Sequence, residues 1–278
     1  MKRDITLVKP REMLAFDGER CTPWVTTQIL SAHLHRYFLT LDLVQGQRVL
    51  DISCGEGYGS ALMFANGASE VTGVDIDTDL IARARRVYGT AGLTFKTADA
   101  RAPLPFDDHS FDIIVSFETI EHIREHDGFV AELARVLSPN GTLVISTPDK
   151  AQSDPNQPNP FHERELGEDE FHDLLAEYFS HVTPHYQGLL HGSIVSGPDK
   201  ASVTWKRTGF LEYTQDDTIQ RRYIIATASN DKPRALPAGM LHDGAIVATL
   251  NRRIKALETQ VKELEASGAS LPEETDHA

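Results

Sequence analysis

Two acidic residues and a histidine lie close together in the stretch Phe117-Glu118-Thr119-Ile120-Glu121-His122. If a helical turn starts here, Glu118, Glu121 and His122 stand at positions i, i+3 and i+4, and their side chains project from one face. Two carboxylates and an imidazole suit a divalent ion such as Mg²⁺, Mn²⁺, Co²⁺ or Zn²⁺, with coordination positions left for substrate oxygens. The alternative is that these residues cap the turn and line a pocket without binding a metal.

A glycine-rich turn lies upstream, where Gly55, Gly57 and Gly59 follow the apolar run that begins at Val49. Glycine lets the backbone approach a ligand closely. The spacing is G-x-G-x-G, whereas dinucleotide-binding turns have G-x-G-x-x-G, so the pattern disfavours the NAD-type cofactor of a dehydrogenase. Asp51, just before the turn, would repel a pyrophosphate but attract an ammonium group. The turn therefore favours a cofactor that carries an amino acid.

A second carboxylate ends the next apolar run, in Gly73-Val74-Asp75-Ile76-Asp77. Asp75 lies about 20 residues beyond the first glycine, the spacing at which a carboxylate accepts hydrogen bonds from ribose hydroxyls. Taken alone, each aspartate could equally be a helix cap or a turn residue. The order of the motifs, more than any single residue, indicates a nucleoside-bearing cofactor.

From about Val49 to Pro148 the chain resembles the class I S-adenosylmethionine (SAM)-dependent methyltransferases in motif order and spacing. The resemblance implies that the cofactor is SAM. It assigns the methionine part of SAM to the glycine turn and the ribose to the second carboxylate. By the same match the adenine edge falls to a Thr-Ala-Asp-Ala stretch, and the sulfonium lies beside the fourth strand. The implied cofactor-binding residues are Asp51, Gly55, Gly57, Gly59, Asp75, Ile76, Asp99, Ala100 and Ser116, with Phe117 lining the cavity.

A downstream stretch, Asn159-Pro160-Phe161-His162-Glu163, extends the resemblance. The order of three motifs is similar to that of the metal-dependent 2′-O-methyltransferases of small-RNA 3′ ends: E-x-x-E-H, then S-T-P, then a loop with a histidine. It is more distantly similar to ubiquinone-pathway O-methyltransferases. By that match Glu118, Glu121, His122 and His162 form a metal site. This chain departs from the RNA enzymes, which have Asp-His-Lys-Phe where it has Phe-His-Glu-Arg. Without a metal, His122 or His162 is the candidate general base, because imidazole titrates near neutral pH.

These motifs need a sheet whose strand ends meet at one edge. Apolar runs alternate with segments of helical periodicity, which predicts an α/β, doubly wound, mainly parallel seven-stranded sheet of the Rossmann-like methyltransferase type. Strands are expected in 48–53, 71–77, 93–99, 111–117 and 141–148, and a further strand at YIIATAS, with a final antiparallel pair. Helices are expected in 24–41, 58–66, 78–88 and 125–137 and around Phe171 to Tyr178.

The chain divides by pattern into five parts. We expect an N-terminal lid and helical extension in residues 1–45 and the SAM-binding core in 46–230. A linker follows in 231–245, and a heptad seam in 246–267 predicts a short coiled coil that makes the protein a homo-oligomer. A single amphipathic helix is the alternative there. Residues 268–278 are expected to be a disordered acidic tail.

Composition restricts the partners. The chain has 27 basic and 41 acidic residues, a net charge of −14, which disfavours nucleic acid as a partner because nucleic-acid binders present a basic face. No apolar run is long enough to span a membrane, and no secretory signal is recognisable, so we expect a cytoplasmic protein. Two cysteines, Cys21 and Cys54, cannot form a disulfide framework.

The acceptor is indicated least directly. The region with Trp205-Lys206-Arg207, Tyr213 and Arg221-Arg222 offers aromatic rings and cations to a sugar or sugar phosphate. The layout looks like bacterial methyltransferases of polysaccharide gene clusters, which implies O-methylation of a sugar or cell-surface glycan hydroxyl and a possible glycosyltransferase partner. Two alternatives stay open: a metal-free small-molecule O- or N-methyltransferase, of quinone or natural-product biosynthesis, with a histidine base, and a non-catalytic SAM-binding assembly module.

Overall fold

The computed structural model describes residues 28–153, 156, 158–189, 193–196, 221–237 and 239–241. Contacts divide the chain into two compact units, Met1–Leu241 and His242–Ala278, and every described residue belongs to the first. Residues 1–27 of the expected N-terminal lid and helical extension, the expected coiled coil in 246–267 and the expected acidic tail lie outside the described residues. In the described part, no helix has the length and apolar character that a membrane crossing requires.

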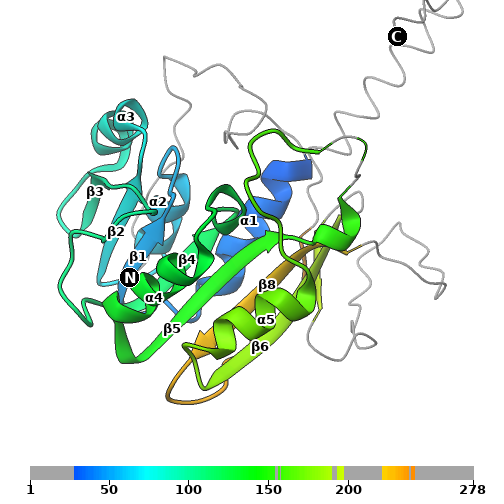
Figure 1. Ribbon diagram of the computed structural model, residues 1–278. Helices are drawn as coiled ribbons and strands as arrows, with labels where there is room; N and C mark the ends of the chain where they lie inside the picture. Colours follow the sequence, from blue (N-terminus) through cyan, green and yellow to red (C-terminus); the bar gives the residue numbers. More distant parts are fainter. Residues whose placement is uncertain are drawn as a thin grey trace, which may run out of the picture. The chain divides into compact units, whose positions relative to one another are not determined.

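Nine described strands form one sheet in the order β3-β2-β1-β4-β5-β8-β6-β7-β9 (Figure 1). The strands are β1 Arg48–Ile52, β2 Glu70–Asp75, β3 Leu93–Thr97, β4 Phe111–Phe117, β5 Leu137–Pro148, β6 His181–Leu189, β7 Ser193–Ser196, β8 Arg221–Ser229 and β9 Gly239–Leu241. The helices are α1 Gln28–Thr40, α2 Tyr58–Ala65, α3 Thr78–Tyr88, α4 His126–Val136 and α5 Glu168–Ala176, with short 3₁₀ turns η1 Ile120–His122 and η2 Lys150–Gln152.

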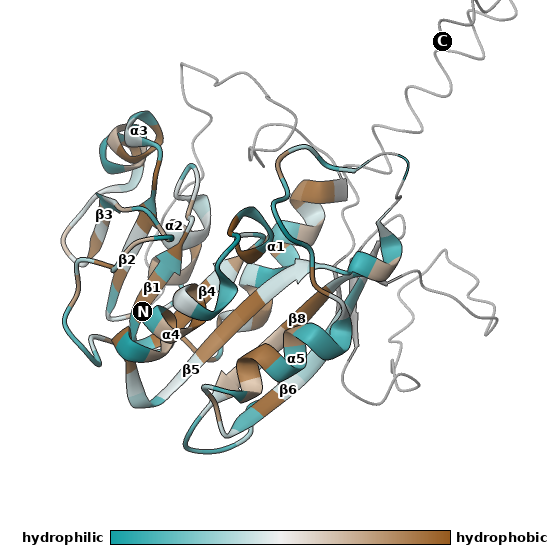
Figure 2. Ribbon diagram, viewed as in Figure 1, coloured by the Kyte–Doolittle hydropathy of each residue, from teal (hydrophilic) through white to brown (hydrophobic). Residues whose placement is uncertain are grey.

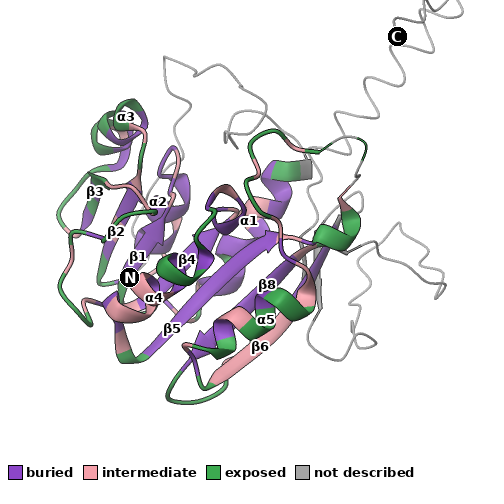
Figure 3. Cartoon of the chain, viewed as in Figure 1, coloured by how far each residue is buried: buried purple, intermediate pink, exposed green. Residues whose placement is uncertain are grey.

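Helices cover both faces of the sheet, as the doubly wound prediction requires. Alternate residues of one strand enter two different cores: Val49 of β1 packs with α1, α2 and α3, whereas Leu50 and Ile52 pack with α4 and α5. Figure 2 shows hydrophobic residues along the central strands, and Figure 3 shows these strands buried. Strands buried on both faces read as continuous apolar runs, which is why the sequence located them.

The sheet is mixed: its first half is parallel as predicted, but its antiparallel part is larger than the predicted pair, and nine described strands take the place of the expected seven. Strands β1 to β5 pair in parallel, but β8 runs antiparallel to both β5 and β6, and the short strands β7 and β9 extend this antiparallel part. Each parallel pair needs a crossover of a dozen or more residues. Only the first half of the sheet is built from such crossovers. In place of the expected antiparallel pair at YIIATAS, the antiparallel part contains four described strands, β8, β6, β7 and β9.

Two local expectations also changed. The strand expected in 141–148 begins earlier, at Leu137, and includes Pro139-Asn140-Gly141 as an irregularity, because Phe111 pairs with Leu137 while Ile113 already pairs with Thr142. The segment 231–245, expected as a linker, packs on the sheet where it is described. Leu236 is buried, and β9 pairs with β7.

The packing of the segment before β9 depends on a neutral histidine. His185 of β6 is fully buried, and its Nε2 accepts a hydrogen bond of 2.9 Å from the backbone N–H of Leu236. Burial lowers the pKa of His185 to about 4. Protonation would both remove the acceptor and place a charge in the core.

We therefore expect the protein to lose stability as the pH is lowered from about 6.5, where an unfolded histidine titrates, to about 4. The unfolded chain binds a proton in this window that buried His185 does not, so the free energy of unfolding is full above the window and lost below it. His185→Gln should reduce the slope of unfolding free energy against pH by up to about 1.4 kcal/mol per pH unit. Urea unfolding at several pH values measures the slope. His172→Gln, at an exposed position of α5, is the control, and an equal change there contradicts the assignment.

Candidate functional site

A cavity of about 900 Å³ opens at the carboxyl ends of the parallel strands. Its wall includes the residues that follow β1, β2, β4 and β5, together with side chains from α1 and from the loop around His162. Ligands of open α/β sheets bind at this edge, where the strand order reverses on the two sides of β1. The cavity therefore joins five of the expected cofactor residues, Gly55, Asp75, Ile76, Asp99 and Ala100, with the expected metal residues in one space.

The glycine turn is a left-handed piece of backbone at the cavity. Ser53, Gly55 and Gly57 have φ angles of 59°, 54° and 82°. Gly55 has open space where a Cβ would stand, and its N–H donates to Asp75 Oδ2 at 2.9 Å. Gly55 is thus the glycine of the turn that faces the cavity.

The other two glycines make room for aromatic rings. A Cβ on Gly57 would stand 2.6 Å from the Phe95 ring, and one on Gly59 would stand 2.0 Å from the Tyr37 ring. The sequence suggested that all three glycines allow close approach of a ligand. In the structure, Gly57 and Gly59 serve the packing of β3 and α1 against the turn.

Asp51 lies behind the cavity wall. The side chain is 1% exposed, and its two oxygens accept hydrogen bonds from Tyr37 Oη at 3.1 Å and Ser60 Oγ at 2.5 Å. Burial raises the pKa of Asp51 to about 7, and the nearby Asp75 carboxylate raises it further against the effect of the two hydrogen bonds. Asp51 can act on a ligand through its charge and through Tyr37, which does line the cavity.

Asp75 stands at the cavity between two segments of backbone. Besides the Gly55 N–H, it accepts from the Asp77 N–H at 3.0 Å, and Asp77 in turn caps α3. A carboxylate has further lone pairs for the hydroxyls of a ribose. Ile76 beside it is 55% exposed although it is apolar, and it lines the cavity.

The remaining cofactor candidates divide between the wall and the core. Asp99 and Ala100 line the cavity, and the guanidinium of Arg101 donates to both oxygens of Asp99 at 2.9 Å. This pairing lowers the pKa of Asp99. Ser116 is completely buried and is not part of the wall, and its Oγ has no hydrogen-bond partner among the described residues.

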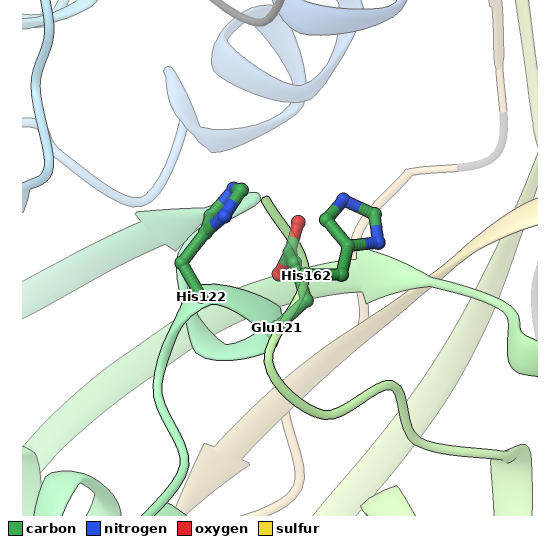
Figure 4. A group of neighbouring side chains, drawn as sticks. All are labelled: Glu121, His122 and His162. Carbon is green, nitrogen blue, oxygen red and sulfur yellow. The ribbon is translucent and has the colours of Figure 1, made fainter. Parts of the chain in front are cut away.

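Three of the four expected metal ligands converge. One ligand atom from each of Glu121, His122 and His162 lies within 4.8 Å of the other two, the arrangement drawn in Figure 4. Glu121 and His122 belong to η1, whereas His162 comes from the loop before α5. The loop is tied to η1 because the backbone N–H groups of Glu163 and Arg164 donate to the Glu121 carbonyl, at 2.8 and 3.2 Å.

Each imidazole of the cluster is held by its Nδ1. His122 Nδ1 donates to the Phe161 carbonyl at 2.9 Å, and His162 Nδ1 donates to Glu165 Oε1 at 2.6 Å. Metal-binding histidines use one ring nitrogen in this way and present the other to the ion. The Nε2 atoms are thus the available ligands, and His162 Nε2 accepts from Asn159 Nδ2 at 3.0 Å.

Glu121 is buried in the cluster and lies close to a second carboxyl group. Burial, with the Glu118 carboxylate next in effect, raises the pKa of Glu121 well above its ordinary value. Thr147 Oγ1 donates to it at 3.3 Å. A buried carboxyl group of this kind needs a cation or a proton to be neutralised.

Glu118 does not join the cluster. Its φ of 54° is left-handed, so the helical turn begins after it, and the expected i, i+3, i+4 face does not form. Its Oε1 accepts from Ser146 Oγ at 2.6 Å and lies 3.7 Å from Arg36 Nη2. The prediction assumed that Glu118, Glu121 and His122 lie in one helical turn. The left-handed backbone at Glu118 breaks that turn.

Sequence reasoning missed Arg36, Tyr37, Tyr223 and Glu165. Arg36 is buried, donates to Gln187 Oε1 at 2.5 Å and lies 4.8 Å from the centre of the Tyr223 ring. Tyr37 lies in the helix expected in 24–41, but its pairing with Asp51 has no signal in the sequence. These contacts join segments that are distant in the chain.

Comparison with known proteins decides the family. A probable S-adenosylmethionine-dependent methyltransferase of Mycolicibacterium smegmatis is 34% identical over 185 residues, which are 65% of this chain and 70% of the relative. The chain belongs to the SAM-dependent methyltransferases. The methyltransferase-domain family model matches residues 50–145 of this methyltransferase. A fatty-acid O-methyltransferase of the same species is 36% identical over 104 residues, 37% of this chain and 38% of the relative.

A solved structure has the same fold. The PH0226 protein of Pyrococcus horikoshii aligns with a TM-score of 0.51 at 21% identity, over 74% of this methyltransferase and 93% of that chain. The cavity also suits SAM on its own observations. Gly55 leaves open space at the wall, Ile76 exposes an apolar side chain beside Asp75, and acidic groups offer partners to the cationic cofactor.

Two glycine substitutions separate ligand contact from packing. Gly55→Ala places a methyl group toward the cavity, so it should weaken binding of S-adenosylhomocysteine, while its left-handed backbone costs about 1–2 kcal/mol of stability. Gly59→Ala meets the Tyr37 ring, and we expect it to cost about 3 kcal/mol or more, as in an overpacked core. Urea unfolding and calorimetric titration measure the two quantities. A larger loss of stability in Gly55→Ala than in Gly59→Ala contradicts this division.

Proposed function

We propose that this methyltransferase is a divalent-metal-dependent O-methyltransferase and that its acceptor is a hydroxyl of a sugar or cell-surface glycan. The observation that carries the proposal is the cluster of Glu121, His122 and His162 in the cavity that also holds the cofactor residues. SAM supplies an electrophilic methyl group, so the protein has to orient one acceptor atom and accommodate its proton.

The donor set supports a transition-metal ion. Two imidazoles and one carboxylate leave coordination positions open, and imidazole suits Mn²⁺, Co²⁺ or Zn²⁺ better than Mg²⁺, which prefers oxygen ligands. His122 and His162 are already oriented by hydrogen bonds at Nδ1. Buried Glu121 gains most from a cation, because a bound ion would replace its proton. Lewis acidity at this point would lower the pKa of an acceptor hydroxyl.

The wall near the cluster supports a polar acceptor. Gln152, Ser153, Asn159 and Arg222 line this side of the cavity and offer donors and acceptors. Phe161 lines it as well and is 54% exposed, so it offers an apolar surface beside the polar groups. A sugar has hydroxyls at its edge and an apolar ring face, which matches this combination.

The alternative is a metal-free methyltransferase that acts on a small molecule, with His122 or His162 as the general base. The similarity to a fatty-acid O-methyltransferase favours it over part of the chain. Glu118 is no longer required as a ligand in either mechanism. The expected homo-oligomer or glycosyltransferase contact through residues 246–267 stays a proposal.

Metal binding can be tested without an acceptor. We expect one Mn²⁺ or Co²⁺ per chain by calorimetry, and loss of measurable binding in Glu121→Gln and His162→Gln. Glu165→Gln removes only the carboxylate behind His162, so metal affinity should fall by about 10- to 100-fold. Glu163→Gln is the matched control, since its exposed side chain pairs with Arg124 and not with the cluster. Equal affinity in all four variants removes the metal from the proposal.

Turnover then tests the acceptor. Conversion of SAM to S-adenosylhomocysteine is followed with nucleotide sugars, methyl glycosides and fatty acids, with EDTA and after restoring one ion at a time. Activity on sugars that EDTA abolishes supports the proposal. Activity that ignores EDTA assigns the reaction to a histidine base, and a response to fatty acids alone overturns the sugar acceptor.

A further inference from the structure

Tyr37 lines the cavity, and its hydroxyl is hydrogen-bonded to a buried carboxylate behind the wall. Tyr37 lies on α1, outside the segment matched by the family model, yet it lines the cavity next to the glycine turn. Its Oη donates to Asp51 Oδ1 at 3.1 Å. Asp51, which is not part of the wall, has its other oxygen occupied by Ser60 Oγ.

The direction of this hydrogen bond decides what the hydroxyl can bind. An ionised carboxylate only accepts, so Tyr37 has used its one proton on Asp51 and keeps two lone pairs. The negative charge behind it disfavours an anion at the same point. A cationic donor is favoured by the lone pairs and by the charge together.

The position of the ring is fixed from several sides. Tyr37 packs edge-on against Tyr58 and Phe117, with ring centres 5.8 and 5.1 Å apart, and both of these rings line the cavity. Gly59 lies directly beneath the ring, where any Cβ would collide with it at 2.0 Å. The third glycine of the turn therefore allows α1 to bring this hydroxyl to the site.

We propose that Tyr37 binds the amino group of the methionine part of SAM, accepting a hydrogen bond from the ammonium while donating to Asp51. Asp51 then acts on the cofactor through Tyr37, and α1 forms part of the cofactor site. The inference rests on family membership and requires neither the metal nor the sugar acceptor.

The test compares two ligands that differ in the amino-acid part. S-adenosylhomocysteine carries the ammonium, whereas 5′-methylthioadenosine keeps the adenosine and sulfur without it. In Tyr37→Phe we expect S-adenosylhomocysteine to bind about 10- to 100-fold more weakly, the usual range for a hydrogen bond to a charged group. Binding of 5′-methylthioadenosine should change less than about twofold. Calorimetry, with ligand-observed NMR at millimolar concentration for weak binding, gives both affinities.

Tyr88→Phe is the matched control, because the Tyr88 hydroxyl is buried on α3 and, in the part of the chain that the structure describes, has no hydrogen-bond partner. It should leave both affinities unchanged. Equal weakening of both ligands in Tyr37→Phe assigns Tyr37 a structural role and overturns the proposal. Unchanged binding of S-adenosylhomocysteine overturns it as well.

A measurement on the unaltered protein keeps the proposal testable if Tyr37→Phe does not fold. The titratable groups facing Asp51 are Tyr37, Cys54 and Asp75, and burial raises the pKa of Asp51 to about 7. Affinity for S-adenosylhomocysteine should therefore rise with pH across this value, as Asp51 ionises, while affinity for 5′-methylthioadenosine stays flat. Parallel pH profiles for the two ligands contradict the proposal.

Discussion

The parallel pairing of β1 with both β2 and β4 is the constraint on which the site depends. Ile52 is in register with Val74 on one side and with Ser116 on the other, so the three strands end at the same edge. The glycine turn, Asp75 and the start of η1 follow directly from these ends. The pairing of the strands therefore brings the glycine turn and η1 to one place, although they are far apart in the chain. Contacts between their own side chains are not needed for this.

Removal of two carboxyl groups from water determines the acid–base properties of this edge of the sheet. Asp51 and Glu121 are both buried, and burial raises the pKa of each. A buried carboxylate is costly unless donors or cations compensate for the lost water. Asp51 has two hydroxyl donors, whereas Glu121 has one long hydrogen bond from Thr147 and two imidazoles beside it. Hydroxyl donors occupy both oxygens of Asp51, whereas Glu121 is also under the charge of Arg36 and lies beside two potential metal ligands. The two ends of the cavity differ for this reason.

Much of the fold could be predicted because its signals are local. Strands β1 and β4 are buried on both faces and read as apolar runs, whereas β3 has exposed residues between its buried ones. The helices between the strands show their periodicity within single segments. The mixed part was predicted incompletely, since β8 follows β7 in the chain yet lies between β5 and β6. The order of such strands depends on which apolar faces of the sheet are still uncovered. It cannot be predicted from any single segment of the sequence. The face shared by Glu118, Glu121 and His122 failed because of one left-handed residue.

The sequence by itself determined the doubly wound core, the glycine turn with Asp75 beyond it, and the residue types of the cluster of Glu121, His122 and His162, because each depends on short-range spacing and residue chemistry. Tertiary structure alone decided that Glu118 turns toward Arg36, that Gly59 accommodates Tyr37, and that Asp51 lies behind the wall. These outcomes depend on contacts between α1, the sheet and the turn. Packing fixes such contacts through the shape and burial of whole side chains, and no spacing within one segment specifies them.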